Sequence, residues 1–267
     1  MRIKGLIAID LDGTLLPSDG TLSKESERIL SSLSDQGYMI VLATGRPLRS
    51  LLPSYDRLRC FGPVIAYNGA HRFHPTDPSF PAKKRVFPKE LVHKIFDIAK
   101  QKEEYSFMAE TDSVRYCSRK DDCLDPYFPP ENIQTRFISE ASQIEEDLNT
   151  CVVLVSEADK EKIRGLLKLE KGVSLRNWSA SPYSELFFPE ETKGEALREI
   201  AGFYGCPKED IYAFGDADND VSMLECAGHP YAMKGCKSKA LSSAFPSTKK
   251  GCSEDGVAFE LSILFNL

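Results

Sequence analysis

The sequence is poor in several features that mark whole classes of protein. It has four histidines and no Cys-x-x-Cys pair, so a structural zinc site has little support. No uninterrupted apolar stretch reaches the roughly 18 residues that a membrane helix needs. The 34 basic residues are outnumbered by 40 acidic ones, whereas nucleic-acid-binding proteins usually carry a basic surface. We therefore expect no membrane and no nucleic-acid partner.

No secretory leader is visible either. The apolar run near the amino terminus is short and is interrupted at Asp10, which favours a cytoplasmic protein. The even number of cysteines could indicate disulfides, but at this chain length and without a leader we expect reduced, mostly buried thiols. The eight are Cys60, Cys117, Cys123, Cys151, Cys206, Cys226, Cys236 and Cys252.

The chain of 267 residues is long enough for two hydrophobic cores. Apolar runs at residues 3–9, 38–43 and 63–66 alternate with helical patterns that begin near Ser23 and Pro47. Strand and helix in alternation predict an α/β fold built on a doubly wound parallel sheet. The same pattern returns near residue 190, with a helix at 193–204, a strand at 211–214, a helix at 218–226, a strand at 230–233 and a helix at 255–265.

Between these two segments the pattern is different. A Pro-containing stretch at residues 75–81 could be a linker, and a separate α+β module follows. Its expected helices are 88–102 and 157–169, and its expected strands are 105–110, 114–118, 151–155, 173–178 and 184–188, with a loop at 119–135. The sequence therefore predicts a discontinuous core, residues 1–81 and 189–267, with residues 82–188 inserted.

Polar clusters follow three of the predicted core strands, at residues 10–14, 44–46 and 67–69. In doubly wound sheets the ligand site lies beyond the carboxyl ends of the strands, so these clusters should converge. In the first cluster, Asp10 could attack phosphorus while Asp12 handles protons. The alternative is that both aspartates only cap a strand and a turn.

The second cluster offers a phosphate site. The Thr44 hydroxyl and nearby backbone N–H groups suit a phosphate oxygen, although Thr44 could instead be the N-cap of the helix begun by Pro47. Lys193 opens a helix, where an acid is normally preferred, and this misfit favours an anion nearby. The alternative is an ordinary surface lysine.

Residues 215–220 place three carboxylates, Asp216, Asp218 and Asp220, directly after a predicted strand. Hard oxygen ligands at this density suit Mg²⁺. The alternative is an acidic first helical turn, which the helix dipole favours. The spacing does not fit a calcium loop of the EF-hand type.

Taken together, these clusters resemble the haloacid dehalogenase superfamily of phosphohydrolases. Tyr67-Asn68-Gly69-Ala70 and Glu254-Asp255-Gly256-Val257-Ala258 extend the similarity over both segments of the core. The insertion makes the chain similar to the Cof-like class IIB sugar-phosphatase group. The four matching motifs are Asp10-Leu11-Asp12-Gly13-Thr14-Leu15, Ala43-Thr44-Gly45-Arg46, Lys193-Gly194-x-Ala196-Leu197 and Gly215-Asp216-x-x-Asn219-Asp220.

The resemblance implies a Rossmann-like core with an inserted α/β cap that selects the substrate. It implies an Mg²⁺-dependent phosphatase of small phosphorylated metabolites, with sugar phosphates as the leading class. We expect the assembly to be a monomer or a weak homo-oligomer. By resemblance, Asp10 is the nucleophile and Asp12 the general acid and then base. The resemblance also implies that Mg²⁺ is held by Asp10, the Asp12 carbonyl and Asp216. The residues that it implies for phosphate binding are Leu11, Thr44, Gly45, Lys193 and Asn219. Arg46, Asn68 and Asp220 would support the site, and Asp220 would act on Lys193 or on a metal-bound water.

One departure from the family pattern concerns Gly235, which stands where the family often has Asn, so no role is carried onto it. In the cap, four residues could face the substrate or could be ordinary cap residues: Glu110, Arg115, Arg176 and Tyr183. A phosphomutase of the phosphomannomutase type is the alternative enzyme. A non-catalytic binding protein is a third possibility, but it predicts the loss of a key acid or lysine, and all are present.

Overall fold

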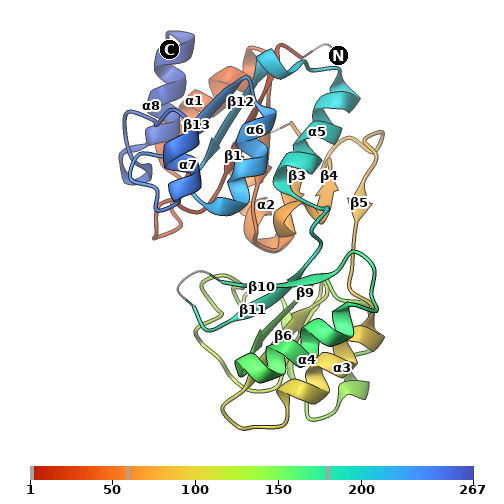
Figure 1. Cartoon of the computed structure of the whole chain (residues 1–267). Coiled ribbons are helices and arrows are strands. Elements are labelled where there is room, and N and C mark those ends of the chain that lie inside the picture. The colour runs from red at the N-terminus through yellow and green to blue at the C-terminus, as the bar shows by residue number, and fades with distance from the viewer. Residues whose placement is uncertain (1–2, 59–60, 179–180) are drawn as a thin grey trace. The chain divides into compact units, whose positions relative to one another are not determined.

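The computed structural model describes residues 3–58, 61–178 and 181–267, so Cys60 lies outside the described residues. The chain forms two compact units. One is discontinuous and consists of Met1–Lys84 and Glu191–Leu267, and the other is the inserted segment Arg85–Glu190. Figure 1 shows the elements of both units along the chain.

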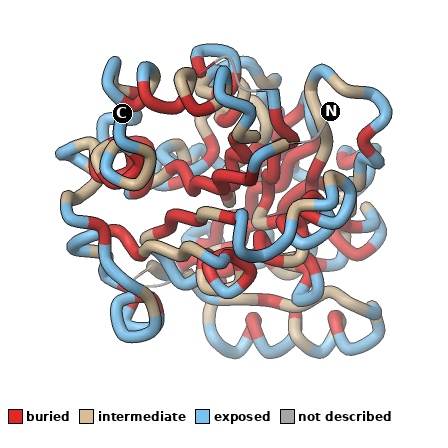
Figure 2. The backbone as a smooth tube through the Cα atoms, turned by 90° about the horizontal axis from the view of Figure 1, so that it is seen from above, coloured by how far each residue is buried: buried red, intermediate tan, exposed pale blue. Residues whose placement is uncertain are grey.

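The discontinuous unit contains a seven-stranded sheet in the order β13-β12-β1-β2-β3-β4-β5. Strand β1 (Gly5–Asp10) lies between β2 (Tyr38–Ala43) and β12 (Ile211–Gly215) and runs parallel to both. Strands β3 (Val64–Ala66) and β13 (His229–Ala232) extend the parallel part. All of β1 is buried, as Figure 2 indicates for the strands at the centre of the sheet. The predicted parallel α/β core is confirmed.

Two short strands at one edge were not predicted. Strand β4 (His71–Phe73) runs antiparallel to β3, and β5 (Lys83–Lys84) runs antiparallel to β4. Arg72 of β4 is fully buried and donates to Glu191 and Glu199, at 2.7 and 2.6 Å. Lys83 also pairs with Glu191, at 3.0 Å. These ion pairs join the residues at which the chain leaves and re-enters this unit.

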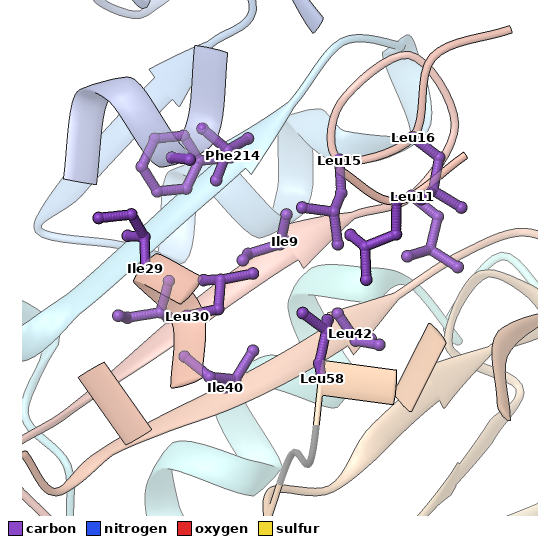
Figure 3. Close-up of a cluster of buried hydrophobic side chains, with 14 of the residues drawn as sticks. Ile9, Leu11, Leu15, Leu16, Ile29, Leu30, Ile40, Leu42, Leu58 and Phe214 are labelled. Carbon is purple, nitrogen blue, oxygen red and sulfur yellow. The ribbon is translucent and has the colours of Figure 1, made fainter. Parts of the chain in front are cut away.

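Helices cover both faces of the core sheet. Helices α1 (Lys24–Asp35), α2 (Leu48–Leu58) and α8 (Gly256–Phe265) pack on the face that carries Ile7 and Ile9. Figure 3 shows part of this cluster, in which Leu11 and Leu15 lie beside Ile9 and Leu42. Helices α5 (Lys193–Tyr204), α6 (Val221–Cys226) and α7 (Lys239–Ala244) pack on the opposite face; α7 was not predicted. Because successive side chains of β1 point to opposite faces of the sheet and are apolar on both, helices cover β1 on both faces.

The inserted unit has a six-stranded sheet in the order β10-β11-β9-β6-β7-β8. Most pairings are antiparallel, and only β7 and β8 run parallel. Strand β8 falls at the end of the stretch predicted as a loop. The elements are α3 (Lys89–Ala99), β6 (Ser106–Glu110), β7 (Val114–Cys117), β8 (Gln134–Phe137), β9 (Thr150–Leu154), α4 (Glu157–Leu167), β10 (Ser174–Asn177) and β11 (Ser184–Phe187).

The seven cysteines among the described residues are free thiols, as predicted. The expectation that most would be buried is only partly correct, because three are buried, three are intermediate and Cys123 is exposed. Within the described part of the chain, no helix combines the length and the apolar character that spanning a membrane would require.

Candidate active site

The first polar cluster, residues 10–14, begins at the carboxyl end of β1. Asp10 is the last residue of β1 and is buried. The chain then folds back on itself, with the backbone N–H groups of Leu15 and Leu16 donating to the carbonyl of Leu11 at 3.0 and 2.7 Å. Since the Leu11 side chain is fully buried in the core (Figure 3), only its backbone is available to a phosphate.

Lys193 lies among the carboxylates. Its Nζ donates to Asp10 Oδ1 at 2.5 Å and to Asp220 Oδ1 at 2.6 Å, and its side chain has no exposed surface. Thr192 is the N-cap of α5, because its hydroxyl accepts the Glu195 N–H. Two carboxylates thus lie beside Lys193, and the surface-lysine alternative is wrong; that Lys193 binds a phosphoryl group stays a prediction.

The cluster carries more negative than positive charge. Burial raises the pKa of Asp10 well above its ordinary value, and Asp220 raises it further, although Lys193 opposes both. Burial and Asp220 raise the pKa of Asp216 to about 6 in the same way. Burial alone would lower the pKa of Lys193, but Asp10 and Asp220 more than offset this and hold it above its ordinary value. One ammonium group therefore contacts two of the three carboxylates, Asp10 and Asp220, and acts on Asp216 only through its charge.

This acidic cluster fits a metal ion. Oxygen atoms of Asp10, Asp216 and Asp220 lie within 4.8 Å of one another. Both oxygens of Asp220 already have partners, since Oδ1 accepts from Lys193 and Oδ2 accepts the N–H groups of Asp216 and Ala217, at 3.0 and 3.1 Å. Asp10 and Asp216 are therefore the better candidates for ligands, and a divalent cation would relieve their mutual repulsion.

Thr44 follows β2 and is fully buried. It does not cap α2, which begins four residues later at Leu48, so that alternative is wrong. Its hydroxyl instead accepts the Arg46 N–H at 3.0 Å. The Arg46 guanidinium reaches the Asp12 carboxylate with Nε 2.6 Å from Oδ2 and with Nη2 beside Oδ1. This pairing was not predicted, and nothing in the sequence signals it.

The third polar cluster, residues 67–69, connects the second cluster, residues 44–46, with the acidic stretch at residues 215–220. Asn68 accepts a hydrogen bond from the side-chain amide of Asn219 at 2.7 Å. Its backbone N–H donates to the Thr44 carbonyl at 3.0 Å. Tyr67 and Asn68 both have positive φ, of 48° and 56°. Such strain in non-glycine residues is common at functional sites.

Two further residues of these motifs have structural partners. The Thr14 hydroxyl donates to Asp216 Oδ1 at 3.4 Å, a contact that we did not predict although Thr14 belongs to the first motif. Asp218 lies apart from the Lys193 cluster and accepts from the Ser238 hydroxyl. Gly235 has φ +81°, a conformation that glycine and asparagine tolerate best, which is consistent with the exchange of one for the other.

The four candidate cap residues all have partners within the inserted unit. Arg115 Nε donates to Glu110 at 2.8 Å, and Arg176 donates to Glu185 at 2.7 Å. The Tyr183 hydroxyl donates to Asp121 at 2.7 Å. These contacts favour the interpretation that the four are ordinary residues of this unit.

Comparison with known proteins gives a consistent result. The family model for haloacid dehalogenase-like hydrolases matches residues 7–261 of this chain. The chain is 32% identical over 265 residues to the Bacillus subtilis 5-amino-6-(5-phospho-D-ribitylamino)uracil phosphatase YitU, covering 98% of both chains. It is 28% identical over 240 residues to the Escherichia coli pyridoxal phosphate phosphatase YbhA, covering 85% of this chain and 87% of YbhA.

Solved structures show the same fold. A haloacid dehalogenase-like hydrolase from Bacteroides thetaiotaomicron superposes with a TM-score of 0.82 at 23% identity, covering 98% of this chain and 99% of that one. The subclass IIB sugar phosphatase BT4131 superposes with a TM-score of 0.76 at 21% identity, covering 98% of this chain and 100% of that one. At these identities the structural similarity extends to the fold alone.

Proposed function

The chain belongs to the haloacid dehalogenase-like hydrolase family and is a phosphoric monoester hydrolase, and we propose that it acts on small phosphorylated metabolites through an aspartyl-phosphate on Asp10. The observation that carries this proposal is the ion pair of Asp10 with the buried Lys193. The lysine orients one carboxylate oxygen and leaves the other available to attack phosphorus. A buried ammonium group beside the nucleophile also offsets the charge of an incoming phosphoryl group.

The phosphate-binding residues follow from the same cluster. Lys193, the Thr44 hydroxyl, the backbone of Leu11 and Gly45, and the Asn219 amide are the donors that we assign to the phosphoryl oxygens. Asn68 supports Asn219 through their hydrogen bond. Asp220 supports Lys193, because it accepts a second hydrogen bond from the ammonium group that contacts Asp10.

For the metal, we propose Asp10, Asp216 and the backbone carbonyl of Asp12 as ligands, with Mg²⁺ as the ion. The excess of carboxylates over ammonium groups and the raised pKa of Asp216, about 6, support a divalent cation here. A bound Mg²⁺ would offset the negative charge of the phosphoryl oxygens.

Asp12 is the proposed proton donor and acceptor. As the Asp10–phosphorus bond forms and the ester bond breaks, Asp12 gives its proton to the leaving oxygen. It then takes a proton from the water that hydrolyses the aspartyl-phosphate, which restores both aspartates. Asp12 suits this role because its side chain is 45% exposed, whereas Asp10 is buried.

We propose sugar and sugar-alcohol phosphates as the substrate class, with residues 85–190 as the unit that selects among them. Support comes from the name of the 32% identical relative, whose substrate contains a phosphorylated ribityl chain. The proposed cytoplasmic location agrees with this class of substrate.

The test is phosphate release with Mg²⁺ from a panel of sugar phosphates, ribitol phosphate, 5-amino-6-(5-phospho-D-ribitylamino)uracil and pyridoxal phosphate. We expect turnover of at least one sugar or sugar-alcohol ester, and loss of that turnover in Asp10→Asn. Asp35→Asn, at the exposed end of α1, is the matched control and should keep full activity. Full turnover by Asp10→Asn would remove Asp10 as the nucleophile. Isomerised sugar phosphate without free phosphate would indicate a mutase instead.

A further inference from the structure

The ion pair between Arg46 and Asp12 has the form of a positioning contact. Two guanidinium nitrogens meet the two oxygens of one carboxylate, with Nε 2.6 Å from Oδ2 and Nη2 beside Oδ1. A bidentate pair of this kind fixes the rotation of the carboxylate as well as its distance. It still leaves a lone pair on each oxygen for a further hydrogen bond.

The backbone that carries Arg46 is itself held. Its N–H donates to the Thr44 hydroxyl at 3.0 Å, and its carbonyl accepts the Tyr67 N–H at 3.2 Å. The guanidinium therefore extends from a fixed point between β2 and α2. It joins the loop after β2 to the loop after β1, two segments that contribute different parts of the site.

Stability alone is a weak explanation for this ion pair. The two side chains are 26% and 45% exposed, and ion pairs at such positions contribute little to folding. The cations of the site are also divided between the aspartates: Lys193 binds Asp10 and Asp220, whereas Arg46 binds Asp12. Among the residues that the structure describes, Arg46 is the one that forms a side-chain hydrogen bond with the Asp12 carboxylate.

We propose that Arg46 is a positioning residue that orients the Asp12 carboxylate toward the leaving oxygen of the substrate. This inference rests on the proposed role of Asp12 as the proton donor. Arg46 itself transfers no proton and forms no bond to the substrate. Without it the carboxylate rotates freely, and the proton reaches the leaving oxygen in only a fraction of the bound complexes.

The proposal predicts a dependence on the leaving group. A sugar alkoxide leaves poorly unless it receives a proton, whereas p-nitrophenolate is stable without one. We therefore expect Arg46→Met to lower kcat for an alkyl ester such as a sugar phosphate by about 10- to 100-fold, and for p-nitrophenyl phosphate by less than about 3-fold. Arg46→Lys should recover part of the loss, since an ammonium restores the charge but not the two-point contact.

A double-mutant cycle separates orientation from other roles. Arg46→Met in an Asp12→Asn background should cause little further loss, because the group that it orients is already inactive. Arg28→Met is the matched control: Arg28 makes a bidentate contact of the same kind with Glu25 on the exposed face of α1, at 2.9 and 2.6 Å, and its loss should affect neither ester. Unfolding midpoints of all variants show whether they are folded.

The outcomes are distinguishable. Equal losses for both esters in Arg46→Met, or a raised KM with unchanged kcat, would overturn the positioning role and indicate phosphate binding instead. A full additional loss in the double mutant would overturn it as well. If Asp12→Asn itself shows no dependence on the leaving group, the proposed role of Asp12 fails, and the inference about Arg46 fails with it.

Discussion

Position 13 requires a glycine because the Asp216 side chain leaves no room for a Cβ there. It has φ +78°, and a Cβ at this position would lie 2.4 Å from Asp216 Oδ2. Gly20 has a similar φ of +72°, but a Cβ there would meet nothing within 4 Å. A side chain at either position would therefore strain the backbone, but only a side chain at Gly13 would also clash with Asp216, the proposed metal ligand.

We expect Gly20→Ala to lower the free energy of unfolding by about 1 kcal/mol through backbone strain alone. Gly13→Ala should cost about 1–3 kcal/mol more, because Asp216 must move, and it should weaken Mg²⁺ binding. Denaturant unfolding and calorimetric titration with Mg²⁺ measure the two effects. Equal losses in the two variants would show that the contact with Asp216 is unimportant.

Single residues also show the limits of sequence interpretation. The location of Asp10 at the end of β1 could be predicted, since an apolar run stops there. The contact of Lys193 with an anion could be predicted from its place in the first turn of a helix. The pairing of Arg46 with Asp12 could not, because it depends on the relative orientation of two loops 34 residues apart.

At the scale of elements, long and strongly patterned segments were predictable, and short polar ones were not. Strands β1, β2 and β9 each contain four or more consecutive apolar residues. The missed strands lack such a signal: β5 is Lys83–Lys84, and all of β8 is exposed. Their strand conformation depends on the neighbouring edge of the sheet, which the local sequence does not specify.

Helix α4 provides a test of electrostatics in the inserted unit. Lys162, Tyr105 and Ser156 all donate to the Asp159 carboxylate, at 2.7, 2.5 and 2.9 Å. These hydrogen bonds, above all that from Lys162, hold the pKa of Asp159 below its ordinary value. A carboxyl group whose pKa is lower in the folded state stabilises the protein above its unfolded pKa, roughly 3.9.

We therefore expect Asp159→Asn to be less stable than the parent at pH 7, with a difference that shrinks as the pH falls below about 4. Urea unfolding followed through Trp178, the single tryptophan, reports on this unit. Glu161→Gln, on the same helix and 71% exposed, is the control and should have little effect. A stability difference that stayed constant from pH 7 to pH 3 would contradict the assignment.

At the scale of the molecule, the acidic cluster should make stability depend on the metal. Mg²⁺ at about 100 times its Kd should raise the free energy of unfolding by about 2.7 kcal/mol, since binding favours the folded state. Hydrogen exchange in β1 and β12 should slow accordingly, and chelation should reverse the effect. Asp216→Asn should reduce both responses, so an unchanged response in that variant would argue against Asp216 as a ligand.

The order of the strands has a consequence for synthesis of the chain. Strand β1 pairs with β12, so that Leu6 lies opposite Ile211, and the whole inserted unit is translated between them. Until Ile211 leaves the ribosome, one edge of β1 has no partner from the chain, and its apolar residues lack the cover of α6, which follows β12. Unpaired apolar edges invite association with other chains. Nascent chains that stall before residue 211 should therefore be the form of this protein most dependent on chaperones.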